Sequence, residues 1–122
     1  MKVLVVDDDY AVLDAMKDIL EDEGYEVSVA ANGLEAFKEL AQGPPPCVIL
    51  LDLMMPVMNG WEFREKQLED EGLAAIPTII VTAHNKPEVN AAELKAATSI
   101  RKPIAPALLL ETVGRYCTAS AD

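Results

Sequence analysis

The sequence lacks long apolar runs and has little positive charge. Its longest apolar runs, such as Cys47 to Leu51, fall far short of the roughly 20 residues needed to cross a bilayer. The N-terminal Met1-Lys2-Val3 lacks the apolar stretch and the small-residue cleavage site of a signal peptide. Ten Lys and Arg residues stand against 21 Asp and Glu, and the formal net charge of -11 would repel a nucleic-acid backbone. We therefore expect a cytoplasmic protein that neither inserts into a membrane nor binds nucleic acid directly.

Cysteine and histidine are also scarce. Cys47 and Cys117 lie far apart, form no CxxC pair and sit among apolar neighbours. We therefore expect two small buried hydrophobic side chains rather than a disulfide or a metal site. The single histidine, His84, has no second histidine with which to share a metal, so we expect it to lie exposed in a loop.

The hydrophobic content of 51% is ample for one packed core, and its pattern indicates buried strands. Val3 to Val6, Val48 to Leu51 and Ile79 to Val81 are short, continuously apolar runs rich in β-branched residues, as in strands covered on both faces. Glu26 to Ala30 alternates between apolar and polar residues and predicts an edge strand. Ile100 belongs to a short fifth strand.

Segments with helical periodicity alternate with these strands. Apolar or weakly apolar stripes mark five of them: Val12, Met16 and Ile19; Leu34, Phe37 and Leu40; Trp61 to Glu71; Glu88 to Ala97; and Leu109, Val113 and Tyr116. Parallel strands need helical crossovers, so the sequence predicts a doubly wound, three-layer α/β fold with a five-stranded parallel sheet in the flavodoxin-like order 2-1-3-4-5. We expect one domain over residues 1–117 and a polar tail over residues 118–122.

Acidic residues follow two of the predicted central strands directly. Asp7, Asp8 and Asp9 come after the first strand and Asp52 after the third, and the carboxyl ends of these strands meet where the sheet order reverses. Two carboxylates about 4 Å apart repel by roughly 4 kcal/mol at an effective dielectric constant near 20, so a cation is needed among them. Oxygen ligands of this kind suit magnesium. The alternative is that Asp8 or Asp9 caps a helix and Asp52 is an ordinary loop residue.

Two more polar residues end strands on the same side of the sheet. Thr82 closes the predicted fourth strand and Lys102 the fifth. A phosphoryl group on Asp52 would need a cation, a hydroxyl donor and an ammonium group around its oxygens, because phosphoryl transfer depends mainly on positioning and charge neutralisation. The combination therefore favours a phosphoryl-binding site over an unremarkable loop.

At these residues the sequence resembles the receiver domains of bacterial response regulators. The similar motifs are VVDDD after the first strand, LLDLMMPVMNG around Asp52, VTA at the fourth strand and KP at the fifth, and they span essentially the whole chain. The resemblance implies that Asp52 accepts a phosphoryl group, as a signalling domain rather than as an enzyme with a separate substrate. It also implies that Asp7, Asp8, Asp52 and the backbone carbonyl of Met54 hold magnesium.

The same resemblance implies that Thr82 and Lys102 bind the phosphoryl group and that the Lys102-Pro103 bond is cis. Its partners would be a sensor histidine kinase or a histidine phosphotransfer protein, and a downstream target or an output domain. The sequence departs from the family pattern at Ser99, where receivers commonly carry an aromatic residue, and the segment before Lys102 is about two residues short. We therefore expect the signal to be carried chiefly by displacement of the lightly packed helix Glu88 to Ala97 and its preceding loop around His84 to Pro87. Asn59 replaces a common acid and serves a turn equally well.

Three other functions fit the sequence less well. A haloacid-dehalogenase-type phosphatase would need Thr or Val where this chain has Ala11, and would need room for a cap domain. A mononucleotide-binding flavodoxin-like module would need a glycine-rich phosphate loop, where this chain has three acids. A degenerate receiver that only binds proteins is favoured by Ser99 alone.

Overall fold

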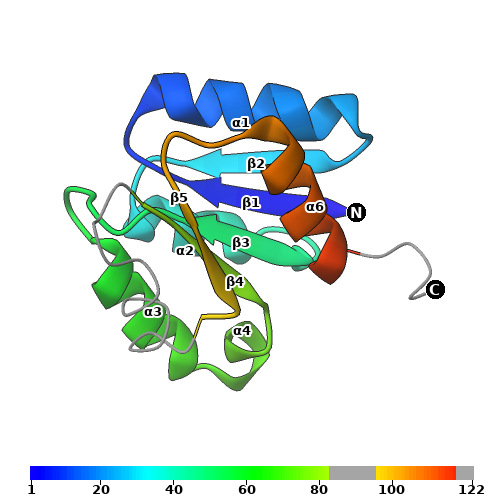
Figure 1. The fold of residues 1–122 in the computed structure, drawn as a ribbon. Helices are drawn as coiled ribbons and strands as arrows, with labels where there is room; N and C mark the ends of the chain where they lie inside the picture. Colours follow the sequence, from blue (N-terminus) through cyan, green and yellow to red (C-terminus); the bar gives the residue numbers. More distant parts are fainter. Residues whose placement is uncertain (83–95, 118–122) are drawn as a thin grey trace.

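A five-stranded parallel sheet forms the centre of the molecule (Figure 1). The computed structural model describes residues 1–82 and 96–117. The strand order is β2-β1-β3-β4-β5, as predicted. The strands are β1 (Lys2–Val6), β2 (Glu26–Ala30), β3 (Val48–Leu51), β4 (Thr78–Thr82) and β5 (Thr98–Arg101).

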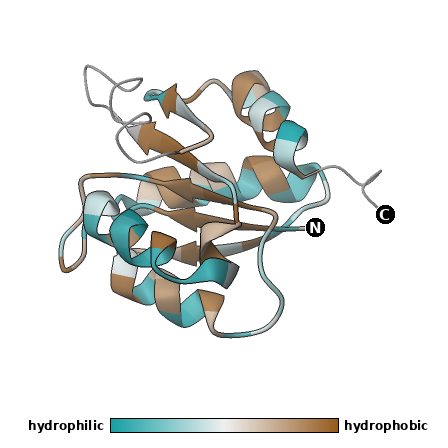
Figure 2. Ribbon diagram, turned by 90° about the horizontal axis from the view of Figure 1, so that it is seen from below, coloured by the Kyte–Doolittle hydropathy of each residue, from teal (hydrophilic) through white to brown (hydrophobic). Residues whose placement is uncertain are grey.

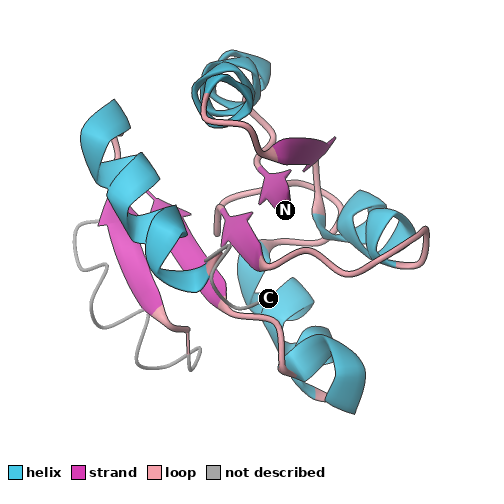
Figure 3. Ribbon diagram, turned by 90° about the vertical axis from the view of Figure 1, so that its right-hand side faces the viewer, coloured by secondary structure: helices cyan, strands magenta, loops and turns pink. Residues whose placement is uncertain are grey.

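Helices cover both faces of the sheet (Figure 3). They are α1 (Tyr10–Asp22), α2 (Gly33–Leu40), α3 (Gly60–Leu68), α4 (Glu71–Ala74) and α6 (Pro106–Tyr116). Helices α1 and α6 pack on the face that carries Val3 and Val5, whereas α2 and α3 pack on the face that carries Leu4 and Val6. Both faces of β1 are therefore buried, which explains its continuous apolar sequence (Figure 2).

The helix faces differ in detail from the predicted stripes. In α1 the buried side chains are Leu13, Met16 and Leu20, while Val12 and Ile19 lie only at the edge of the core. The predicted stripe therefore contains one core residue, Met16, and two residues at the flank of the buried face.

In α2 the expected core residue Leu34 is 45% exposed. Gly33 and Ala36 are buried in its place. A Cβ on Gly33 would lie 2.7 Å from Cγ of Met58, so the first turn of the helix rests directly on the loop after β3. The helix therefore presents Gly33 and Ala36 to the core, and Leu34 lies outside this buried face.

The predicted helix over residues 61–71 is divided in two, and its weak apolar stripe has a structural cause. Asp70 is the N-cap of α4, and its side chain accepts hydrogen bonds from the amides of Gly72 and Leu73. Gln67 of α3 is fully buried and its amide nitrogen donates to the Leu73 carbonyl at 2.8 Å. The hydroxyl of Thr78 in β4 donates to the side-chain oxygen Oε1 of Gln67 at 3.2 Å. Helix α3 is thus attached through buried hydrogen bonds as well as apolar contacts.

The expectation for the two cysteines is wrong. Cys47 and Cys117 form a disulfide, with their Cα atoms 5.4 Å apart. Cys47 precedes β3 and Cys117 caps the C-terminal end of α6, so the fold brings together two residues whose sequence context gave no sign of pairing.

Several expectations fall on residues beyond those described. His84, most of the predicted helix Glu88 to Ala97, and the tail Thr118 to Asp122 lie outside the described residues. Within residues 1–82 and 96–117, no helix has both the length and the hydropathy to span a membrane.

Candidate functional site

The carboxyl end of the sheet brings together acidic residues from two strands and a lysine from a third. Asp7 follows β1, Asp52 follows β3 and Lys102 follows β5. The strand hydrogen bonding continues through both acids, because the amide of Asp7 donates to the Ala30 carbonyl at 3.0 Å and that of Asp52 to the Val6 carbonyl at 2.9 Å. The backbone of the sheet therefore sets the positions of these two carboxylates.

Asp7, Asp8 and Asp52 form a compact group of possible metal ligands. One carboxylate oxygen of each lies within 4.8 Å of those of the other two. Asp7 and Asp52 are buried, whereas Asp8 is exposed. Three hard oxygen donors with one side open to solvent fit a magnesium ion, which keeps several water or phosphate ligands in addition to protein carboxylates. The residues present therefore fit the metal that the sequence predicted.

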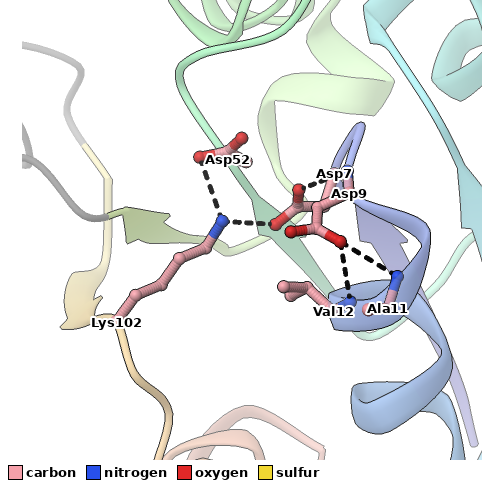
Figure 4. Close-up of polar contacts among 6 residues, drawn as sticks. All are labelled: Asp7, Asp9, Ala11, Val12, Asp52 and Lys102. Atoms are coloured by element: carbon pink, nitrogen blue, oxygen red, sulfur yellow. Dashed lines mark hydrogen bonds and ion pairs between the residues drawn. The ribbon is translucent and has the colours of Figure 1, made fainter.

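The third acid of the run, Asp9, belongs to helix α1. Its Oδ1 accepts hydrogen bonds from the amides of Ala11 at 3.0 Å and Val12 at 3.4 Å, which makes it the N-cap (Figure 4). The backbone amide of Asp9 donates to Oδ1 of Asp7 at 3.0 Å. The capping alternative thus holds for Asp9, while Asp8 remains with the acidic group.

Lys102 reaches between the two buried acids (Figure 4). Its Nζ lies 2.7 Å from Oδ2 of Asp7 and 3.7 Å from Oδ1 of Asp52. Burial by itself would lower the pKa of Lys102, but the hydrogen bond to Asp7 and the negative charges of Asp52 and Asp7 raise it on balance. The ammonium is therefore charged and balances part of the acidic cluster.

Asp52 has an unusually high proton affinity for an aspartate in the absence of a metal. Burial, followed by the charge of Asp7, raises its pKa from 3.8 to about 6, although Lys102 and a backbone hydrogen bond from Met54 act in the opposite direction. The lysine alone therefore does not compensate the acidic cluster fully, which is the electrostatic condition that favours a bound divalent cation.

Close backbone packing holds the loop after Asp52. Gly60 begins α3, and a Cβ at this position would lie 2.6 Å from the carbonyl oxygen of Asp52 and 2.7 Å from Cα of Leu53. The Gly60 amide donates to the Leu53 carbonyl at 3.0 Å. In the sequence the Asn59-Gly60 pair indicates only a turn, and the contact shows in addition that this glycine allows α3 to approach the site closely.

Asn59 is the N-cap of α3 and forms a reciprocal capping box with Glu62. An asparagine is therefore sufficient here, in agreement with the sequence interpretation. Beside it, a hollow of about 390 Å³ borders Asp8 and is lined in part by Met54 and Trp61. The hollow therefore lies next to the exposed side of the acidic group.

The structure describes the positions of the remaining predicted residues only in part. The backbone of Thr82 ends β4 opposite Arg101, but its side chain lies outside the described residues. The peptide bond between Lys102 and Pro103 is cis, as the family resemblance implied. Ser99 lies in β5 opposite Ile80. The roles of Thr82 and of the Met54 carbonyl remain predictions.

Comparison with known proteins agrees with this arrangement. Residues 3–114 match the family model for the response regulator receiver domain. The chain is 33% identical to the polar-differentiation response regulator DivK of Brucella anthropi, covering 93% of this chain and 94% of DivK. It is also similar to the structure of the chemotaxis protein CheY4 of Vibrio cholerae, with 33% identity, a TM-score of 0.86, and coverage of 95% of this chain and 98% of that one.

Other relatives are longer. The chain is 32% identical to the probable transcriptional regulator ycf29 of Porphyra purpurea, but it spans only 54% of that protein's length. Similarity to the receiver family is thus seen both with proteins of this size and with part of a longer one. The chain belongs to the response regulator receiver domain family, which acts in two-component signalling.

Proposed function

We propose that this domain is a phosphorylation switch in which Asp52 accepts a phosphoryl group from a phosphohistidine of a sensor histidine kinase or a histidine phosphotransfer protein. One observation carries the proposal: Asp52 is buried beside Asp7 and Asp8 in a group of possible metal ligands, with the Lys102 ammonium 3.7 Å from its carboxylate. An ordinary loop aspartate would have neither neighbour.

The chemistry follows from the carboxylate of Asp52. One of its oxygens attacks the phosphorus atom, the bond from phosphorus to the histidine nitrogen breaks, and the electron pair of that bond remains on the imidazole, which takes up a proton. Asp7, Asp8, Asp52 and the Met54 carbonyl would hold magnesium, which supplies charge neutralisation for the phosphoryl oxygens and favours the ionised, nucleophilic form of Asp52. The domain thus modifies its own side chain.

Lys102 and Thr82 would respond to the new group. The Lys102 ammonium lies 1 Å closer to Asp7 than to Asp52, and its flexible side chain can turn toward the additional negative charge of an aspartyl phosphate. The Thr82 hydroxyl would donate to a phosphoryl oxygen from the end of the neighbouring strand. These contacts exist only in the phosphorylated state, so they can shift the conformation of the domain.

We place this function in the cytoplasm, where the domain would pass its state to a downstream target protein or to an output domain. The test is incubation of the chain with magnesium and phosphoramidate, a small donor with the same phosphorus-nitrogen bond, followed by intact mass spectrometry. One phosphoryl group should be added to the parent and none to Asp52→Asn.

Two controls identify the role of the metal. A chelator and the variant Asp8→Ala should each slow the modification, whereas Asp14→Ala, on the exposed side of α1, should not. Phosphorylation of Asp52→Asn at the parental rate would overturn the proposal, and so would a parental rate that a chelator leaves unchanged. The absence of modification in the parent would instead support the degenerate receiver.

A further inference from the structure

The disulfide joins the start of β3, the strand that leads to Asp52, to the end of α6, and it lies at the end of the sheet opposite the site. Cys47 immediately precedes β3, which leads to Asp52, and Cys117 follows α6, whose chain begins just after Lys102. The C-terminal end of α6 lies beside the amino end of β3 (Figure 1). Asp52 and Lys102 are in turn linked by their ion pair at 3.7 Å. The disulfide at one end of the sheet and the ion pair at the other therefore both connect the segment around Asp52 to the segment around Lys102.

The surroundings of the two sulfur atoms suit the reduced state as well. Sγ of Cys47 lies 3.2 Å from the carbonyl oxygen of Lys2, where a thiol can donate a hydrogen bond. Cys117 is 5% exposed and packs in the core that contains Leu109 and Val113, where a thiol serves as a small apolar group. The surroundings of both cysteines are therefore compatible with free thiols.

The two cysteine residues differ in their exposure to solvent. Cys47 is half-buried at the surface before β3, whereas Cys117 is buried beneath the end of α6. An external thiol or disulfide can therefore reach Cys47 first, and Cys117 is held close enough to complete the exchange. This division of roles is the arrangement expected of an attacking cysteine and a resolving cysteine.

We propose that Cys47 and Cys117 are a reversible thiol-disulfide site whose reaction partner is a low-molecular-weight thiol or disulfide of the glutathione type. The inference extends the proposed function, because disulfides in a reducing cytoplasm are usually transient and redox-sensing. In the oxidised state the C-terminal end of α6 is tied to β3, and in the reduced state it is held by packing alone.

The exchange proceeds in two balanced steps. The Cys47 thiolate attacks one sulfur of the small disulfide, so that a mixed disulfide forms on Cys47 and one small thiolate leaves. The Cys117 thiolate then attacks Sγ of Cys47, the mixed disulfide breaks, and a second small thiolate leaves. Each protein thiol has lost one proton, and the small disulfide has been reduced to two thiols. Reduction is the reverse sequence.

The experiment uses the full chain in buffers of varied glutathione to glutathione disulfide ratio, with acid quenching, alkylation and intact mass spectrometry. Native protein should pass reversibly between a form that takes two alkyl groups and a form that takes none. Cys117→Ala should accumulate a glutathione adduct on Cys47, and Cys47→Ser should accumulate much less on the buried Cys117. A parallel series with a thioredoxin-type protein dithiol as reductant distinguishes a protein partner: reduction only by that protein would overturn the small-molecule assignment.

A second readout concerns α6. Backbone hydrogen exchange in its last turn, Thr112 to Tyr116, should be faster in the reduced parent than in the oxidised parent. The double variant Cys47→Ser with Cys117→Ala should exchange at the reduced rate in every buffer. A native chain that keeps two alkylatable thiols in every buffer would overturn the proposal, and so would a disulfide that small thiols cannot reduce without unfolding. Neither readout uses magnesium or a phosphodonor, so failure here is distinct from failure of the proposed phosphorylation.

Discussion

The ammonium group of Lys102 lies closer to Asp7 than to the proposed phosphoacceptor Asp52, at 2.7 Å against 3.7 Å. Both carboxylates are almost completely buried, whereas the lysine side chain is 20% exposed. One cation is therefore shared by two buried anions. In the metal-free protein Lys102 balances only part of the negative charge. Removing the lysine should therefore lower the free energy of unfolding most when no divalent cation is present.

Replacing Lys102 by Met should lower the free energy of unfolding more in a chelator than in millimolar magnesium. Removing one partner of a buried ion pair costs about 3–5 kcal/mol, and the partial exposure of Lys102 places the expected loss near the lower value. Urea unfolding in the two buffers measures the difference. Lys38→Met, which removes the same charge from the exposed side of α2, should show little change in either buffer. Equal losses for Lys102→Met with and without magnesium would contradict the shared-charge account.

Asp52 should make the stability of the metal-free domain depend on pH. Its pKa is about 6 in the folded state against 3.8 for an ordinary aspartate, so the folded state binds the proton more tightly. The stability that this proton provides is complete below pH 3.8 and is lost as the pH rises through about 6. At pH 7 the ionised carboxylate therefore destabilises the metal-free fold.

The variant Asp52→Asn should remove this dependence. At pH 7 and in a chelator, it should raise the free energy of unfolding by about 3 kcal/mol, since a pKa of about 6 against 3.8 corresponds to slightly more than two tenfold changes in proton affinity, each of about 1.4 kcal/mol. Urea titrations at pH 4, 5, 6 and 7 would show the gap between variant and parent widening with pH. The exposed-site variant Asp14→Asn is the matched control, and a gap that stays constant across this range would refute the assignment.

The residues at the carboxyl end of the sheet could be predicted because the strands can be recognised from their apolar sequence. A strand buried on both faces is apolar at every position, so the first polar residue after Val6 or Leu51 marks the end of the strand. Once the sheet order was inferred, Asp7 and Asp52 had to be neighbours. The distances among the acids and the lysine depend on side-chain packing and could not be obtained in this way.

Other features depend on contacts between residues distant in the sequence. Adjacent acids in a run look alike, and only the starting point of α1 assigns Asp9 to capping and leaves Asp8 in the acidic group with Asp7 and Asp52. The disulfide joins residues separated by 70 positions, and the apolar surroundings of each cysteine are equally compatible with free thiols. The close approach of Gly33 to Met58 is likewise a contact that no local pattern reveals.

Gly60→Ala should destabilise the domain and disturb the site. The new Cβ would meet backbone atoms of Asp52 and Leu53 at 2.6 and 2.7 Å, and backbone cannot move aside as a flexible side chain could. Overpacking of this kind costs about 1–3 kcal/mol. We expect a lower urea midpoint together with slower phosphorylation, because the Asp52 backbone must shift.

The control for this substitution is Gly114→Ala in α6, where an added Cβ has no neighbour within 4 Å. Alanine is favoured over glycine inside a helix by about 1 kcal/mol, so this variant should be more stable than the parent. Its phosphorylation rate should be unchanged. If both alanine variants changed stability in the same direction, the close contact at Gly60 could not be the cause.

Reduction of the disulfide should lower stability without unfolding the domain. A cross-link spanning 70 residues restricts the unfolded chain, and loop-closure entropy assigns such a link about 4 kcal/mol. The reduced fold should persist because both thiols have accommodating positions, one near the Lys2 carbonyl and one in the core. Urea unfolding monitored through Trp61 should therefore give a lower midpoint in reductant. The urea dependence should also be steeper, since an unlinked chain exposes more surface on unfolding.

The double variant Cys47→Ser with Cys117→Ala should resemble the reduced parent in both buffers. A midpoint that reductant leaves unchanged, in a sample shown by alkylation to be fully reduced, would mean that the bond contributes nothing to the stability of the fold.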